Sequence, residues 1–80
     1  MFQRDTLMPW ANVTQNIEVA LQLGGTPKAQ WPARIAQLLE LLGLSAYGHY
    51  LPAALSGGMR QRVALGRLLA YAPDLYLMDE

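Results

Sequence analysis

The sequence contains no cysteine and little charge. Without cysteine there are no disulfides and no thiolate metal sites, although this absence does not fix the compartment. Charged residues make up only 15% of the chain, and Lys and Arg balance Asp and Glu to a net charge of zero. This balance argues against non-specific binding to nucleic acid or to anionic lipid.

The sequence also lacks a long apolar run. No stretch approaches the roughly 20 residues that a membrane-spanning helix needs. Residues 1–10 carry charges at Arg4 and Asp5 and have no apolar centre, so they do not resemble a signal peptide. We therefore expect a soluble or peripheral protein.

Apolar residues, by contrast, make up 52% of the 80 residues. A chain of this length forms one small domain at most and buries a modest fraction of its surface. So high an apolar fraction indicates that part of the apolar surface meets something outside these residues. We therefore expect the chain to be a segment of a longer protein, and its isolated form to be marginally stable.

The stretch Leu55–Val63 predicts a helix whose first turn is left uncovered. Ser56 is a good N-cap, and Gly57 and Gly58 carry no side chains over the first N–H groups of the helix. A helix N-terminus also concentrates about half a positive charge. A phosphate is therefore expected to accept hydrogen bonds from Ser56, Gly57 and Gly58.

Two amphipathic helices are expected before this stretch. Asn12 and Gln15 have the spacing of a capping box for a helix over about residues 13–22, which Gly24–Gly25 should end. The second helix is expected to start near Ala29. Its apolar stripe and its expected C-terminal Schellman motif involve Ile35, Leu38, Leu39, Leu42, Gly43 and Leu44.

Two loops flank these helices. Residues 4–10 have no periodicity and are predicted to form a loop. Its apolar side chains, Leu7, Met8 and Trp10, are expected either to face a partner or to be buried under their own domain. Ser45–Ala54 is predicted as a single turn or irregular linker. It contains His49, which has no carboxylate or second histidine at ligand spacing, so we expect a solvent-facing or packing role.

The helix from Ser56 to about Tyr71 is expected to be largely buried, because apolar side chains occupy both of its sides. Its arginines are expected to mark the edges that reach solvent or a partner. After it, Leu75–Met78 is an uninterrupted apolar run, typical of a strand inside a parallel sheet. That strand would place Asp79 and Glu80 at its carboxyl end, where α/β sheets bind ligands. Two neighbouring acids at such a position favour a site in which one carboxylate binds a hard cation and the other polarises a water molecule. The alternative interpretation is that both acids lie in a solvated chain end.

Residues 55–59, Leu-Ser-Gly-Gly-Met, resemble the LSGGQ signature of the nucleotide-binding subunits of ABC transporters. Residues 60–65 continue as the RQRVAL run typical of importers, and residues 73–80 resemble the Walker B strand. Phe2–Gln3 is similar to the Q-loop, so the resemblance covers essentially the whole chain. The departures are Met59, where Gln is usual, and Gly66 and Leu68, where alanines are common.

This resemblance implies an α/β fold of the P-loop NTPase type, of which the chain is a mostly helical part. It divides the chain into a Q-loop region (1–12), a helical subdomain (13–54), the signature motif and its helix (55–72) and the Walker B strand (73–80). The sequence has no GxxxxGK[ST] P-loop and no switch histidine after Walker B. We therefore expect these residues alone to be inactive.

The resemblance also implies ATP and Mg²⁺ as ligands. Gln3 would contact the metal or the attacking water, Asp79 would hold Mg²⁺ through water, and Glu80 would be the general base. In the family's head-to-tail dimer, residues 56–58 would contact the γ-phosphate of ATP held by the opposite subunit.

Leu7-x-Pro9-Trp10 after the Q-loop resembles importers of the nitrate, sulfonate and taurine group. The implied function is ATP hydrolysis that energises a bacterial importer, by a subunit peripheral to the cytoplasmic face of the inner membrane. Leu7, Met8 and Trp10 would lie near the groove that receives a coupling helix of the permease, and this now explains the apolar loop better than self-burial. The second hypothesis is a soluble ABC-type ATPase that acts on nucleic acid or ribosomes, and the zero net charge and the importer-type run disfavour it. The third hypothesis is a non-catalytic remnant or helical module.

Overall fold

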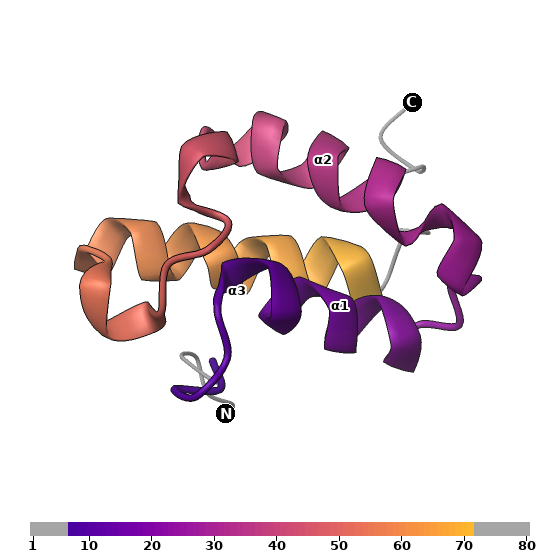
Figure 1. The fold of residues 1–80 in the computed structure, drawn as a ribbon, viewed down its shortest axis with the longest axis horizontal. Coiled ribbons are helices and arrows are strands. Elements are labelled where there is room, and N and C mark those ends of the chain that lie inside the picture. The colour runs from indigo at the N-terminus through magenta and orange to yellow at the C-terminus, as the bar shows by residue number, and fades with distance from the viewer. Residues whose placement is uncertain (1–6, 72–80) are drawn as a thin grey trace.

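The computed structural model describes residues 7–71, which form three α-helices joined by short 3₁₀ turns. The helices are α1 (Val13–Leu23), α2 (Trp31–Leu42) and α3 (Gly57–Tyr71), and within this part of the chain there is no strand (Figure 1). The turns are Lys28–Gln30, Ser45–Tyr47 and Pro52–Ala54. Predictions on Phe2–Gln3 and on the Walker B strand lie outside the described residues.

Helix α1 begins and ends as predicted. The backbone N–H of Gln15 donates to the Asn12 side chain at 2.8 Å, and the N–H of Asn12 donates to the Gln15 side chain at 2.9 Å. These two bonds are the expected capping box. The chain leaves the helix through Gly24 and then Gly25, whose φ of +85° favours glycine.

Helix α2 begins slightly later than predicted and ends as predicted. Its start is Trp31 rather than Ala29, because residues 28–30 form a 3₁₀ turn of their own, and this keeps Pro32 in the first turn. At the other end Gly43 is left-handed, and the N–H of Leu44 donates to the carbonyl of Leu39 at 2.8 Å. Leu44 is completely buried, which confirms the Schellman motif and its apolar contact.

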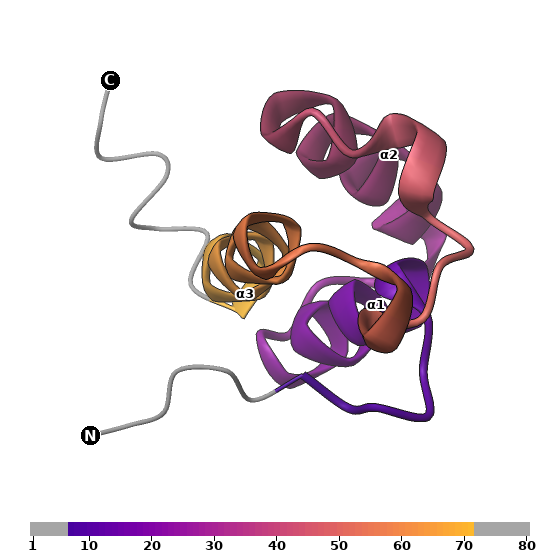
Figure 2. The same cartoon turned by 90° about the vertical axis from the view of Figure 1, so that its left-hand side faces the viewer.

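The three helices form a triangle around one apolar core (Figures 1 and 2). Helix α1 makes its most extensive contact with α3, and α2 packs on both. The core residues come from all three helices and from Leu44 and Leu55 in the connections. The completely or almost completely buried ones include Val13, Ile17, Leu21, Leu38, Leu44 and Val63.

The prediction of a largely buried third helix is wrong for the described residues. Val63, Gly66 and Ala70 face the core, but the opposite side of α3 is open. Leu65, Leu68 and Tyr71 there are 48%, 50% and 55% exposed. The physical reason is that no other element within residues 7–71 packs on this side, so the apolar face has nothing to pack against.

The connection from α2 to α3 is more regular than predicted. It holds two 3₁₀ turns instead of a single turn or an irregular linker, and it contributes to the start of α1. The carbonyls of Gly48 and Tyr50 each accept a hydrogen bond at 3.0 Å, from Thr14 and Val13 respectively. Two N–H groups at the N-terminus of α1, which have no partner inside the helix, are thereby satisfied. His49 between them is exposed, in agreement with the solvent-facing role predicted for it.

Gly24 marks a close approach between the ends of α1 and α3. A Cβ at this position would lie 2.6 Å from the carbonyl oxygen of Tyr71 and 3.0 Å from that of Ala70. Because both neighbours are backbone atoms, the helices must move apart to admit a methyl group. We expect Gly24→Ala to lower the free energy of unfolding by about 2 kcal/mol, measured by urea titration and circular dichroism.

Gly66→Ala is the matched control for this prediction. Its Cβ would lie 2.7 Å from Leu42 Cδ1, which is the end of a flexible side chain rather than backbone. Alanine also gains about 1 kcal/mol of helix propensity there, so we expect almost no net change. Equal losses of stability in the two variants would contradict the role given to Gly24.

Candidate functional site

The start of α3 has the capped geometry that the sequence predicts. Ser56 Oγ accepts a hydrogen bond from the N–H of Met59 at 3.1 Å, and the Ser56 carbonyl accepts one from Arg60 at 3.0 Å. Ser56 is therefore the N-cap. The preceding Leu55 is buried in the core and extended, which holds the cap at the protein surface.

The two glycines after the cap have no packing reason to be glycine among the described residues. A Cβ on Gly57 or Gly58 would have no neighbour closer than 4.0 Å, and neither residue has a positive φ. Each glycine costs about 1 kcal/mol relative to alanine inside a helix. Since Ser56, Gly57 and Gly58 are all exposed, the bare backbone leaves room for something to approach the N–H groups closely.

Met59, the departure from the usual glutamine, belongs to the packing of this helix. Its side chain is partly buried against the core cluster. The exposed side of the turn is therefore formed by residues 56–58, and Met59 packs beneath it against the core.

The loop before α1 is held by a buried polar residue that the sequence reasoning missed. Asn16 is completely buried, and its Oδ1 accepts a hydrogen bond from the N–H of Met8 at 2.8 Å. Its amide nitrogen donates to the carbonyls of Ala11 and Asn12 at 3.0 Å each and to that of Met8 at 3.3 Å. The signal was present: Asn16 lies three residues after Val13 and four before Ala20, on the buried face of α1.

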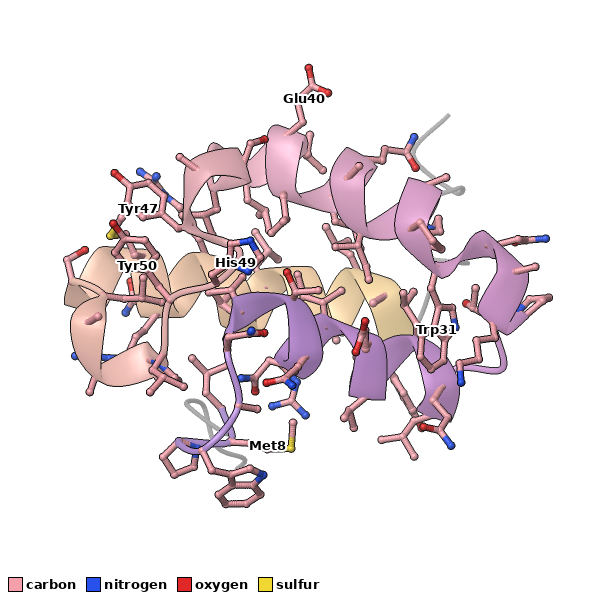
Figure 3. The ribbon with its side chains drawn as sticks, in the orientation of Figure 1. Met8, Trp31, Glu40, Tyr47, His49 and Tyr50 are labelled. Carbon is pink, nitrogen blue, oxygen red and sulfur yellow. The ribbon has the colours of Figure 1, made fainter. Side chains whose placement is uncertain are left out.

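The loop itself combines both predicted roles. Leu7 packs against the core, whereas Trp10 is 76% exposed. Met8 lies on the side of the molecule opposite Glu40 (Figure 3). Asn16 therefore fixes a loop that tucks one apolar side chain inward and presents another outward.

A separate groove lies between α1 and α2 and has a volume of about 620 Å³. Trp31, Ile35 and Leu39 give it an apolar floor, and Glu18, Lys28 and Glu40 contribute charge. The indole N–H of Trp31 donates to the carbonyl of Thr26 at 3.1 Å, which fixes the ring in the lining of the groove. The groove is suited to an apolar segment with polar flanks rather than to a phosphate.

The remaining charged groups do not form a second chemical site within residues 7–71. There, no three His, Cys, Asp or Glu side chains gather around a point that could hold a metal. Burial lowers the pKa of the Arg67 guanidinium, which is half-buried on α3. None of the helices described is both long and apolar enough to cross a membrane.

Comparison with known proteins decides the family. The profile of the ABC transporter family matches residues 1–80. The chain belongs to this family. It is 48% identical to a taurine import ATP-binding protein from Pseudomonas aeruginosa and 45% identical to one from Rhizobium johnstonii, over all 80 residues in each case. It is 51% identical over the same length to a sulfate/thiosulfate import ATP-binding protein from Gloeobacter violaceus.

The chain spans less than a third of the length of these ABC relatives, namely 30% of both taurine proteins and 23% of the sulfate protein. The match to import proteins confirms the predicted resemblance to importers of the taurine and sulfonate type. Of the site residues predicted from that resemblance, the structure describes Ser56, Gly57 and Gly58. Gln3, Asp79 and Glu80 lie outside the described residues.

Proposed function

We propose that this chain is the middle part of an ATP-hydrolysing subunit that energises a bacterial importer for taurine, another sulfonate, nitrate or a similar small solute. The observation that carries the proposal is the uncovered start of α3. Among residues 7–71, two glycines stand there without a packing or conformational reason, next to a serine that caps the helix. Oriented N–H donors of this kind suit the spread negative charge of a phosphoryl group in transfer.

In this proposal Ser56, Gly57 and Gly58 bind the γ-phosphate of ATP that the opposite subunit of a head-to-tail dimer holds. Glu80 accepts a proton from the attacking water, and Gln3 orients that water or contacts the metal. Asp79 holds Mg²⁺ through water, and the ion neutralises charge on the phosphates when it is bound. The subunit lies at the cytoplasmic face of the inner membrane.

Two exposed apolar surfaces fit the same proposal. Trp10, held outward by the loop that Asn16 fixes, contacts a coupling helix of the permease, and the partly buried Leu7 and Met8 lie beside it in the same loop. The open side of α3 packs on the remainder of the nucleotide-binding domain, which explains why Leu65 and Leu68 are half exposed among residues 7–71. A soluble ABC-type ATPase and a non-catalytic remnant are the competing functions.

A chimera tests the proposal. The chain replaces the matched 80 residues of the Pseudomonas aeruginosa taurine import ATP-binding protein, and the product is assembled with that importer's membrane and binding components. We expect taurine-dependent phosphate release. Activity without dependence on taurine would favour the soluble ATPase, and a folded, assembled chimera without activity would favour the remnant.

Two variants of the chimera separate helix capping from phosphate binding. Asp and Asn both cap helices as well as Ser, so Ser56→Asp and Ser56→Asn should fold alike. The aspartate would oppose a bound phosphate, and like charges about 4 Å apart repel by about 1–4 kcal/mol. We expect Ser56→Asp to lose at least about fivefold more activity than Ser56→Asn, where this factor corresponds to about 1 kcal/mol, and equal activities would contradict a phosphate at this turn.

A further inference from the structure

Arg60 folds back over the start of α3 and ties it to the turn before it. Its Nη1 donates to the carbonyl of Leu55 at 2.8 Å and to that of Pro52 at 3.3 Å. Pro52 and Leu55 are both buried. The guanidinium therefore joins the first turn of an exposed helix end to two residues that the core holds in place.

This position is electrostatically unusual. A cation is disfavoured near a helix N-terminus, because the helix dipole places partial positive charge there. The hydrogen bonds from Arg60 to the carbonyls of Pro52 and Leu55 offset that cost, and both carbonyls lie just before Ser56 in the sequence. Arg60 Nη2 lies 4.0 Å from the point that a Gly57 Cβ would occupy, so positive charge sits directly beside the bare backbone of this turn.

We propose that Arg60 is a positioning residue that fixes the direction of the N–H groups at residues 56–58 toward the phosphate. The inference rests on the proposed function. The Ser56 cap orders the turn relative to α3, but the tie through Arg60 orders it relative to the core. Donors aimed at a reacting group act because they are already oriented, and a shift of about 1 Å costs as much as 10²-fold in rate.

Arg60→Met in the chimera tests the inference, because methionine keeps most of the side-chain bulk and removes the donors. We expect kcat for ATP hydrolysis to fall about tenfold, with KM for ATP and the Tm close to those of the parent chimera. Arg60→Lys, which retains one cationic donor group, should recover part of the loss. Arg34→Met is the matched control, since it removes the same charge from the surface of α2 and should leave kcat unchanged.

The outcomes distinguish this inference from the proposed function. An inactive parent chimera would overturn the proposed function, whereas an active parent with unchanged kcat in Arg60→Met would overturn the inference alone. Amide hydrogen exchange on the 80-residue chain provides a readout that needs no activity. We expect Arg60→Met, but not Arg34→Met, to speed exchange at the Met59 N–H, and equal rates in the parent and Arg60→Met would also overturn the inference.

Discussion

Glu80→Gln is expected to lower ATP hydrolysis by the chimera by about 10²–10⁴-fold, the range that a lost general base costs. Glutamine has the shape of glutamate but cannot accept the proton of an attacking water at neutral pH. Binding of ATP should persist, because the substitution removes no donor that faces the phosphates. Phosphate release and equilibrium binding of labelled ATP, measured on the same preparation, check both expectations.

Asp79→Asn is the control that separates the two acids. If Asp79 holds Mg²⁺, its loss weakens metal binding, and part of the activity should return as the Mg²⁺ concentration is raised. Glu80→Gln should show no such recovery. A Glu80→Gln chimera that hydrolyses ATP at the parent rate would show that another group accepts the proton.

The features that could be predicted from the sequence are those decided by a few neighbouring residues. The capping box of Asn12 and Gln15, the left-handed Gly43 and the Ser56 cap each depend on groups at most five positions apart. Their geometry follows from local hydrogen bonding and from the freedom of glycine, so the residue types alone specify it. The same holds for the uncovered first turn of α3.

The features that could not be predicted depend on which surfaces meet. The apolar residues on both sides of α3 indicate burial, but whether Leu65 and Leu68 are covered depends on chain outside residues 7–71. The sequence predicts that the arginines of α3 mark edges that reach solvent or a partner, but it does not indicate that two carbonyls of the preceding turn hold Arg60. The grouping of residues 56–58 with Gln3, Asp79 and Glu80 comes from family resemblance, since no local pattern joins residues so far apart.

Asn16 shows how a long-range role is hidden in a regular helical pattern. A single asparagine within an amphipathic helix has little effect on helix propensity, and its neighbours Val13, Ile17 and Ala20 account for the periodicity by themselves. In the structure its side chain forms hydrogen bonds with backbone groups of the preceding loop, which has no secondary structure in which those groups could pair. The loop that presents Trp10 is thereby anchored to a buried residue of α1.

We expect Asn16→Ala to lower the free energy of unfolding by about 2–4 kcal/mol. The substitution removes hydrogen bonds to one N–H and three carbonyls, and the partly buried N–H of Met8 and the buried carbonyl of Ala11 lose an observed partner. It also leaves a small cavity at a completely buried position. Urea titration of the 80-residue chain measures the loss. Sucrose is added to parent and variant alike, because it stabilises the folded state and so keeps both chains folded at the start of the titration.

Asn12→Ala is the matched control, because it removes the same side-chain atoms at the N-cap of the same helix, where the side chain makes an exposed hydrogen bond. There only the cap is lost, which costs about 1 kcal/mol. The difference between the two variants therefore measures the contribution of burial and of the loop contacts. If the two variants lost the same free energy of unfolding, Asn16 would contribute no more than an ordinary cap, and the loop would have to be held by Leu7 instead.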